Sequence, residues 1–168
     1  MLIEHVVHED SRGFFQETYR SDAFGSLGIP DQFVQDNHSR SVRGVVRGMH
    51  FQPGMAKMIR CVRGEIFDVL VDIRPGSATF GEWEGFTLSD SNHLQLYCPD
   101  RFAHGFVVIS EVADVVYRCS AYYDPSAEAG FAYNDPDVGI SWPPGIALEA
   151  SARDAAAPRL AEIAGSLR

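Results

Sequence analysis

The sequence predicts a mainly β protein, folded as a sandwich or a barrel. Short runs rich in Val, Ile, Phe and Tyr recur along the chain and are separated by Gly, Pro, Asp or Ser, as in antiparallel strands joined by turns. One run, residues 64–77, has a clear period of two, which is the spacing of a strand. Helical character is strong only near the C-terminus. These three observations favour an all-β fold.

The strand in residues 64–77, "GEIFDVLVDIRPGS", is the clearest of the set. One of its faces is wholly apolar, with Phe67, Val69, Val71 and Ile73. The other face is partly polar, with Ile66, Asp68, Leu70 and Asp72. "RPGS" supplies the turn that follows. Further strands are predicted in four runs: 80–88, 92–99, 105–110 and 113–123.

Two helical segments complete the prediction. Residues 12–30 include a short helix that ends at Gly28 and Pro30. Residues 151–168 form a C-terminal helix, with Ser151 or Asp154 as its N-cap. Because no repeat and no linker interrupts the pattern, residues 1–168 are expected to form a single domain.

Composition narrows the class of protein. A net charge of −9 argues against nonspecific binding to nucleic acid. No apolar run approaches the roughly 20 residues that a membrane-spanning helix needs, so no membrane contact is expected. The three cysteines form no CxxC pair, which suits a reduced compartment better than a disulfide framework. We therefore expect a cytoplasmic protein.

Basic residues are concentrated in one part of this acidic chain. Residues 37–64 contain no carboxylate but hold six of the 14 Lys and Arg residues. This stretch is either a solvated cationic face or a pocket for an anionic ligand, because Arg side chains bind phosphate oxygens in pairs. The sequence has neither GxxxxGK[ST] nor GxGxxG, so a nucleotide would not be held by a helix N-terminus.

His50, in "RGMHFQ", is the first candidate for chemistry. Three roles are open to it: a packed core residue, a metal ligand, or a base that removes a proton. A metal site needs three or four ligands at matched spacing, and the residue two after His50 is Gln52, so no metal is expected. A second histidine, His104 in "PDRFAHGF", follows a turn that would aim its imidazole into a barrel. Both histidines therefore favour proton chemistry.

A catalytic imidazole needs a carboxylate that fixes its tautomer. The sequence alone leaves Asp154, Asp68 and Asp72 as candidates, and Asp154 has an alternative role as a helix cap. Tyr117 alternates with Val115, so it is either a core residue or a functional phenol. Lys57 is either solvated or part of the site.

Seven motifs in a fixed order identify the chain as similar to the dTDP-4-dehydrorhamnose 3,5-epimerases, nucleotide-sugar epimerases with a cupin-type β-barrel. They are "RGFFQE", "FVQDNHSRS", "VVRGMHFQ", "KMIRCVRGEIFDVLVDIRPGS", "FAHGF", "YRCSAYY" and "NDPDVGISWP". The resemblance implies an antiparallel jelly-roll barrel, a homodimer, and no cofactor. It also implies a dTDP-4-keto-6-deoxyhexose substrate, inverted at C3 and C5 by proton abstraction and reprotonation through an enolate.

The resemblance also implies roles for individual residues. His50 matches the base, Asp154 its orienting carboxylate, Tyr117 the proton donor on the opposite face and Lys57 the group that stabilises the enolate oxygen. The residues that match or suit substrate-binding positions are Arg12, Phe14, Glu17, Gln35, Asp36, Asn37, Arg47, His104, Tyr122, Glu128 and Arg153. Among these, Phe14 and Tyr122 are expected to stack on the thymine.

Three departures from the family pattern are visible. The loop "QPGMAK" before Lys57 is about three residues shorter than in typical members, the N-terminal strand is shortened, and Arg101 stands where a glycine is usual. Single-centre epimerases share nearly the same residues, so inversion of C3 or C5 alone is the alternative. Two alternatives belong to other functional classes: a noncatalytic module that binds a sugar nucleotide, and a metal-dependent cupin enzyme.

Overall fold

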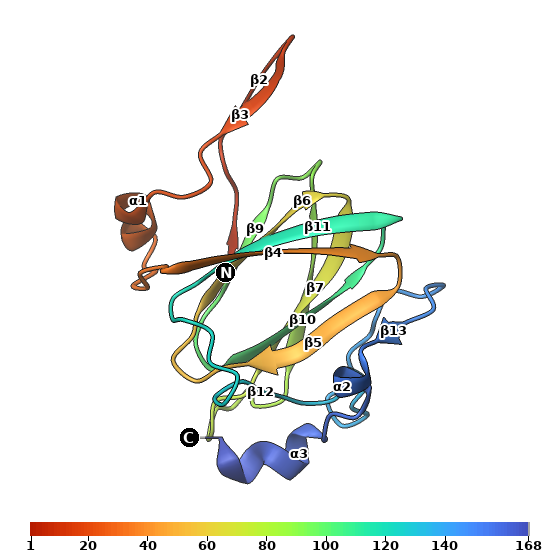
Figure 1. Cartoon of the computed structure of the whole chain (residues 1–168). Helices are drawn as coiled ribbons and strands as arrows, with labels where there is room; N and C mark the ends of the chain where they lie inside the picture. Colours follow the sequence, from red (N-terminus) through yellow and green to blue (C-terminus); the bar gives the residue numbers. More distant parts are fainter. Residues whose placement is uncertain (168) are drawn as a thin grey trace.

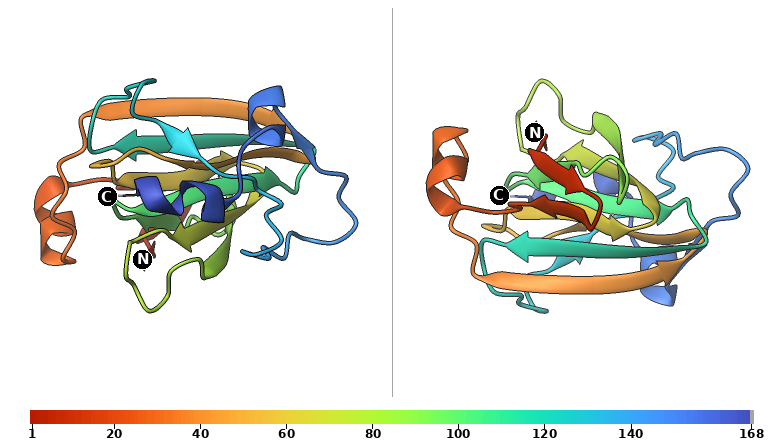
Figure 2. Two further views of the ribbon diagram at one scale, coloured as in Figure 1. Left: turned by 90° about the horizontal axis from the view of Figure 1, so that it is seen from below. Right: turned by 90° about the horizontal axis from the view of Figure 1, so that it is seen from above.

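Two facing antiparallel sheets form the body of the computed structural model, which describes residues 1–167. Figure 1 shows the two layers with the barrel interior between them, and Figure 2 shows the C-terminal helices on one side of the body and the N-terminus on another. Between β4 and β7, consecutive strands alternate between the two sheets. This crossing pattern gives a jelly-roll barrel, so the predicted fold class is confirmed.

The first sheet pairs strands that are distant in sequence. In spatial order it contains β1 (Leu2–Ile3), β9 (Gln95–Cys98), β6 (Lys57–Arg63), β11 (Val112–Cys119) and β4 (Gln35–Val42). All of these pairings are antiparallel. Tyr117 lies opposite Asn37 on one side and Ile59 on the other, so the phenol comes from a strand that is paired on both sides.

The second sheet is built around the strand that carries His50. In spatial order it contains β12 (Ala129–Gly130), β5 (Val45–Phe51), β10 (Phe102–Val108), β7 (Glu65–Asp72) and β8 (Trp83–Ser89). The two-residue strand β13 (Glu149–Ala150) adds to β5 in parallel, opposite Val45 and Val46. The C-terminal part of the chain is thereby joined to β5.

Both faces of β7 are buried, which explains its near-continuous apolar character. Ile66 and Leu70 pack in the interior between the sheets. Val69 and Val71 pack on the outer face of the second sheet, beneath a cover that includes Phe131. The face predicted to be partly polar is therefore the barrel interior, and Asp68 on that face is completely buried.

The helices are short. Helix α1 (Ser21–Ser26) ends before Gly28, as predicted, and Phe24 packs it against the first sheet. The prediction of one helix over residues 151–168 is wrong: the segment forms α2 (Ala152–Ala155), α3 (Leu160–Ile163) and the 3₁₀ helix η1 (Ala164–Ser166). Pro158 separates α2 from α3, because proline lacks a backbone N–H and disfavours helical geometry in the preceding residue. Arg168 lies outside the described residues.

The N-terminal hairpin projects away from the barrel. It consists of β2 (Val7–Asp10) and β3 (Gly13–Gln16), which pair only with each other and extend beyond the body in Figure 1. Phe14 and Phe15 on this hairpin are 59% and 71% exposed. In residues 1–167 no helix combines the length and apolar character needed to cross a membrane.

Replacing Arg101 by glycine should stabilise the protein. Arg101 has a φ of 63°, a left-handed conformation that costs a side-chain-bearing residue about 1 kcal/mol relative to glycine. We expect Arg101→Gly to exceed Arg101→Ala by about 1 kcal/mol in the free energy of unfolding, measured in urea. Both variants lose the guanidinium, so their comparison isolates the backbone. Equal stability of the two variants would contradict the assignment.

The Asp114 carboxylate should make stability dependent on pH in the acid range. Hydrogen bonds from Arg40, at 2.7 and 2.8 Å, are the main cause that lowers the pKa of Asp114 to about 2. Since this pKa lies below the value of about 3.9 in an unfolded chain, the stabilisation is present in full only above about pH 5 and is lost as the pH falls through about 2.

We therefore expect Asp114→Asn to unfold at lower urea concentration than the parent protein at pH 7, and the difference between the two midpoints to shrink as the pH falls toward about 2. The Arg40→Gln variant should behave in the same way, because it removes the other member of the pair. A difference in midpoint that is independent of pH would rule out the ion pair as its cause.

Candidate active site

A β-bulge in β5 places Arg47 and His50 on the same face of the strand. On the neighbouring strand β10, His104 pairs with His50 and Phe106 pairs with Arg47, so β5 has one residue more than its partner over this interval. Gly48 makes the bulge possible: its φ is 132°, and a Cβ there would lie 2.5 Å from the Cα of Gly105. Bulges of this kind re-aim side chains next to functional sites.

The C-terminal segment brings a carboxylate to His50. Strand β13 pairs with β5, and the side chain of Ser151 then caps α2 by accepting a hydrogen bond from the backbone N–H of Asp154. Asp154 is therefore in the first turn of α2 and is not its cap. Its Oδ1 lies 2.7 Å from Nε2 of His50, and the two side chains are 7% and 25% exposed. The carboxylate is thus fixed by the helix and paired with the imidazole.

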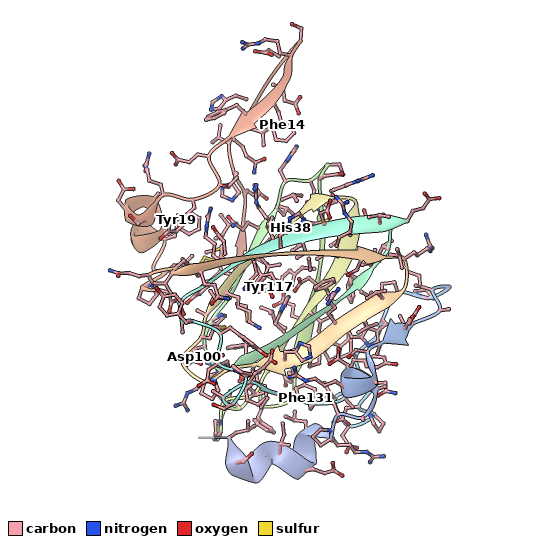
Figure 3. All side chains as sticks on the ribbon, in the orientation of Figure 1. Phe14, Tyr19, His38, Asp100, Tyr117 and Phe131 are labelled. Atoms are coloured by element: carbon pink, nitrogen blue, oxygen red, sulfur yellow. The ribbon has the colours of Figure 1, made fainter. Side chains whose placement is uncertain are left out.

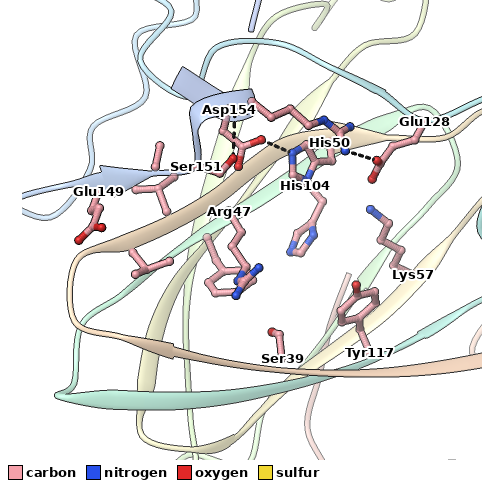
Figure 4. A pocket seen from close by; sticks show the side chains of 15 residues that line it. Ser39, Arg47, His50, Lys57, His104, Tyr117, Glu128, Glu149, Ser151 and Asp154 are labelled. Atoms are coloured by element: carbon pink, nitrogen blue, oxygen red, sulfur yellow. Dashed lines mark hydrogen bonds and ion pairs between the residues drawn. The ribbon is translucent and has the colours of Figure 1, made fainter. Parts of the chain in front are cut away.

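Tyr117 and Lys57 face this pair across a cavity of about 470 Å³. They come from the first sheet, Tyr117 from β11 and Lys57 from the first position of β6. Figure 4 shows both side chains directed into the cavity, opposite the wall that carries His50 and Asp154. Burial is the main cause that raises the pKa of Tyr117, so the phenol keeps its proton at neutral pH. The short loop before Lys57 leaves the lysine in the cavity.

A second imidazole–carboxylate pair lies deeper. Nε2 of His104 is 2.9 Å from Oδ2 of Asp68, and the two side chains are 9% and 0% exposed. His104 lines the cavity, while Asp68 lies behind it and is not part of the lining. Complete burial is the main cause that raises the pKa of Asp68, and His104 acts in the opposite direction.

Two polar contacts organise the rim of the cavity. Arg47 donates a hydrogen bond from Nε to the hydroxyl of Ser41, at 2.9 Å. Arg153 forms an ion pair with Glu128, at 2.6 Å, and the Tyr123 hydroxyl donates to the same carboxylate. This ion pair links α2 to the segment that leads into β12, so it joins two walls of the cavity.

The cavity brings together eight of the residues selected from the sequence, four expected to be catalytic and four expected to bind substrate. They are His50, Asp154, Tyr117, Lys57, Arg47, His104, Glu128 and Arg153. Seven others do not line it: Arg12, Phe14, Glu17, Gln35, Asp36, Asn37 and Tyr122. For each of these fifteen residues the role stays a prediction at this point.

The residues outside the cavity fall into three groups. Arg12, Phe14 and Glu17 belong to the projecting hairpin or follow it, and Figure 3 shows Phe14 far from Tyr117. Asp36 lies on β4, where side chains alternate between the two faces of the sheet. It points to the outer face, where it pairs with Arg118 at 3.2 Å, whereas Gln35 and Asn37 point to the inner face.

Gln35 and Asn37 lie on the inner face of β4, next to the cavity. The side-chain amide of Gln35 donates to the side-chain oxygen of Asn37, at 3.1 Å, and Asn37 lies opposite Tyr117. Tyr122 is 72% exposed. Its neighbour Tyr123 is the aromatic residue that contacts Glu128 at the rim.

Several lining residues were missed in the sequence. Ser39 lines the cavity from β4, and the alternation from Gln35 through Asn37 would have indicated it. Phe106 and Glu149 also line it, but they depend on the bulge and on β13, for which we found no signal in the sequence.

Comparison with known proteins agrees with this geometry. The family model described as "dTDP-4-dehydrorhamnose 3,5-epimerase" matches residues 1–162. The protein of that name from Salmonella typhimurium is 49% identical over 164 residues, which cover 95% of this chain and 90% of the relative. This chain belongs to the dTDP-4-dehydrorhamnose 3,5-epimerase family.

Solved structures in the same family have the same fold. A dTDP-6-deoxy-D-glucose-3,5-epimerase from Legionella pneumophila, in complex with dTDP-4-keto-L-rhamnose, is 46% identical, with a TM-score of 0.95 over 99% of this chain and 90% of the other. A relative from Streptomyces niveus, named dTDP-4-dehydrorhamnose 3-epimerase, is 46% identical over 91% of this chain and 75% of its own length. The family thus includes double and single epimerases.

For an epimerase, the arrangement supplies three requirements. An imidazole paired with a carboxylate lies on one wall, a protonated phenol lies on the opposite wall, and basic side chains also line the cavity. Removal of a proton next to a ketone needs a base, inversion needs a proton donor on the opposite face, and the developing oxyanion needs a nearby cation.

Proposed function

We propose that this protein is an epimerase that inverts C3 and C5 of dTDP-4-keto-6-deoxyglucose. The observation that carries the proposal is the position of the His50–Asp154 pair across the cavity from Tyr117. A proton removed from one face of the sugar and returned from the other inverts the carbon between them. The names of the relatives support the same reaction and the same class of substrate.

In the proposed mechanism, His50 takes the proton from C3 or C5 while Asp154 holds the imidazole in place. The electrons of the broken C–H bond form an enolate with the C4 ketone, and Lys57 stabilises its oxygen. Tyr117 then gives its proton to the opposite face of the same carbon. His50 releases its proton and Tyr117 regains one before the second carbon reacts. This chemistry requires no redox change.

The basic rim suits the nucleotide diphosphate. Arg47 and Arg153 line the cavity, and guanidinium groups bind phosphate oxygens in pairs. Arg153 is paired with Glu128 in this structure, so we propose that phosphate binding competes for this guanidinium. Gln35 and Asn37, adjacent on the inner face of β4, are proposed contacts of the nucleotide.

Inversion of C3 alone is the second candidate, favoured by the 46% identity to the Streptomyces niveus 3-epimerase. The two activities share the same base, donor and enolate. They differ in whether the second carbon also exchanges its hydrogen, which a direct exchange measurement resolves.

We also propose a homodimer, a single epimerase domain over residues 1–168 and a cytoplasmic location. The match over residues 1–162 supports the single domain, and three free cysteines, all buried, suit a reducing compartment. For the dimer, the support is the exposed hairpin: Arg12 and Phe14 do not line the cavity of their own chain. In a dimer they are available to the cavity of the second copy.

Solvent-deuterium exchange tests the function. In deuterated water we expect label at both C3 and C5 of dTDP-4-keto-6-deoxyglucose, read by NMR. His50→Asn should reduce exchange at both carbons by about 10³-fold or more, since it removes the base. Label at C3 alone would establish the single epimerase, and undiminished exchange by His50→Asn would refute the base assignment.

The hairpin proposal has its own test. If Phe14 contacts substrate in a second copy, Phe14→Ala should raise KM about tenfold, which corresponds to the roughly 1.4 kcal/mol of one stacking contact, and should leave kcat nearly unchanged. Leu27→Ala is the control, because Leu27 is also an exposed apolar residue, 51% exposed, on α1's C-terminal side. A monomer in sedimentation equilibrium with full activity would contradict the dimer.

A further inference from the structure

The carboxylate of Asp68 has no role in the mechanism above, yet it is buried at the base of the active-site cavity. Its Oδ2 lies 2.9 Å from Nε2 of His104, and its Oδ1 has no hydrogen-bond partner among the described residues. A buried polar atom without a partner costs about 1–3 kcal/mol. A carboxylate is more costly still unless cations compensate it, so the charges around Asp68 decide what it does.

Two basic side chains and one thiol interact electrostatically with Asp68. His104 comes from β10 and Lys57 from β6, and each acts to lower the pKa of Asp68 against the effect of burial. Cys98 comes from β9, and burial raises the pKa of its thiol to about 12, so the thiol is neutral. On β8 the residue opposite Asp68 is Phe86. Asp68 is therefore hydrogen-bonded to His104 and acts on Lys57 only through space.

Lys57 is the second group whose charge is not compensated locally. Its ammonium group forms no ion pair or hydrogen bond with the residues that the structure describes, and it lines the cavity next to His104. Figure 4 shows both side chains directed into the cavity between His50 and Tyr117. The place that the C4 oxygen occupies in the proposed mechanism is therefore bordered by an imidazole and an ammonium group.

We propose that Asp68 is a positioning residue that orients the imidazole of His104 through Nε2, so that His104 and the Lys57 ammonium group both face the enolate oxygen. The inference rests on the proposed epimerase function and deepens it. The His50–Asp154 pair supplies the base, and the His104–Asp68 pair supplies a polar group beside the C4 oxygen.

Asp68→Asn preserves the shape of the side chain and removes its charge. An amide can present either its oxygen or its nitrogen to Nε2 of His104, so the imidazole loses the single orientation that the carboxylate imposes. We expect kcat for exchange to fall about 10- to 100-fold, as for other residues that orient a functional group from behind, with KM nearly unchanged. A purely structural role of Asp68 would lower stability without this separation of kcat from KM.

The matched control is Asp72→Asn. Asp72 is a buried carboxylate on the same strand, 3% exposed, but it is bonded to Arg74, Ser77 and Thr79 and does not line the cavity. We expect Asp72→Asn to lower thermal stability while kcat stays at the parent value. The double variant Asp68→Asn/His104→Gln should be no slower than His104→Gln alone, since Asp68 acts through His104.

The ring nitrogen shifts of His104, measured by NMR at pH 7 without substrate, keep this inference distinct from the proposed function. Ring nitrogen signals that move or broaden in Asp68→Asn relative to the parent protein support the inference even if the chosen sugar shows no exchange. Ring nitrogen signals of His104 that are the same in the two proteins overturn it. Folded Asp68→Asn with parent kcat, or losses that multiply in the double variant, would overturn it as well.

Discussion

The hydrogen bond between His50 and Asp154 is the contact on which the site depends. It joins residues 104 positions apart in sequence, and neither side chain alone could act as an oriented base. The bond exists because the C-terminal segment returns to β5 through the short parallel strand β13 and then starts α2 at Ser151. Two of the smallest elements of the fold thus determine where the carboxylate lies.

The jelly roll brings the remaining groups to the same cavity from two different sheets. His50 and Arg47 come from β5 and His104 from β10, all in the second sheet, whereas Tyr117 and Lys57 come from β11 and β6 in the first. A sandwich whose sheets face each other can hold groups on both sides of a flat ring. Inversion of a carbon requires this arrangement, because the proton leaves one face and arrives on the other. The barrel interior is apolar below the cavity, which strengthens the electrostatic interactions of the buried pairs.

Much of the fold could be predicted from local patterns, since strands with a period of two and turns rich in Gly and Pro need only neighbouring residues. The predicted catalytic residues also meet in one cavity. Three of them, His50, Tyr117 and Lys57, lie on strands whose motifs could be recognised locally. What the pattern did not indicate is long-range. The choice between Asp154, Asp68 and Asp72 as the partner of His50 depends on strand pairing: Asp68 bonds to His104 instead. The bulge at Gly48 likewise depends on the packing of β10. The break at Pro158, in contrast, is local, and the proline alone could have indicated it.

The central claim is that a hexose ring lies between an imidazole and a phenol. Its most direct test is a crystal structure of this protein with a dTDP-4-keto-6-deoxyhexose bound. We expect His50 against one face of the ring at C3 or C5, the Tyr117 hydroxyl against the other face, and the C4 oxygen at Lys57 and His104. A sugar bound outside the cavity, or His50 and Tyr117 on the same face of the ring, would contradict it.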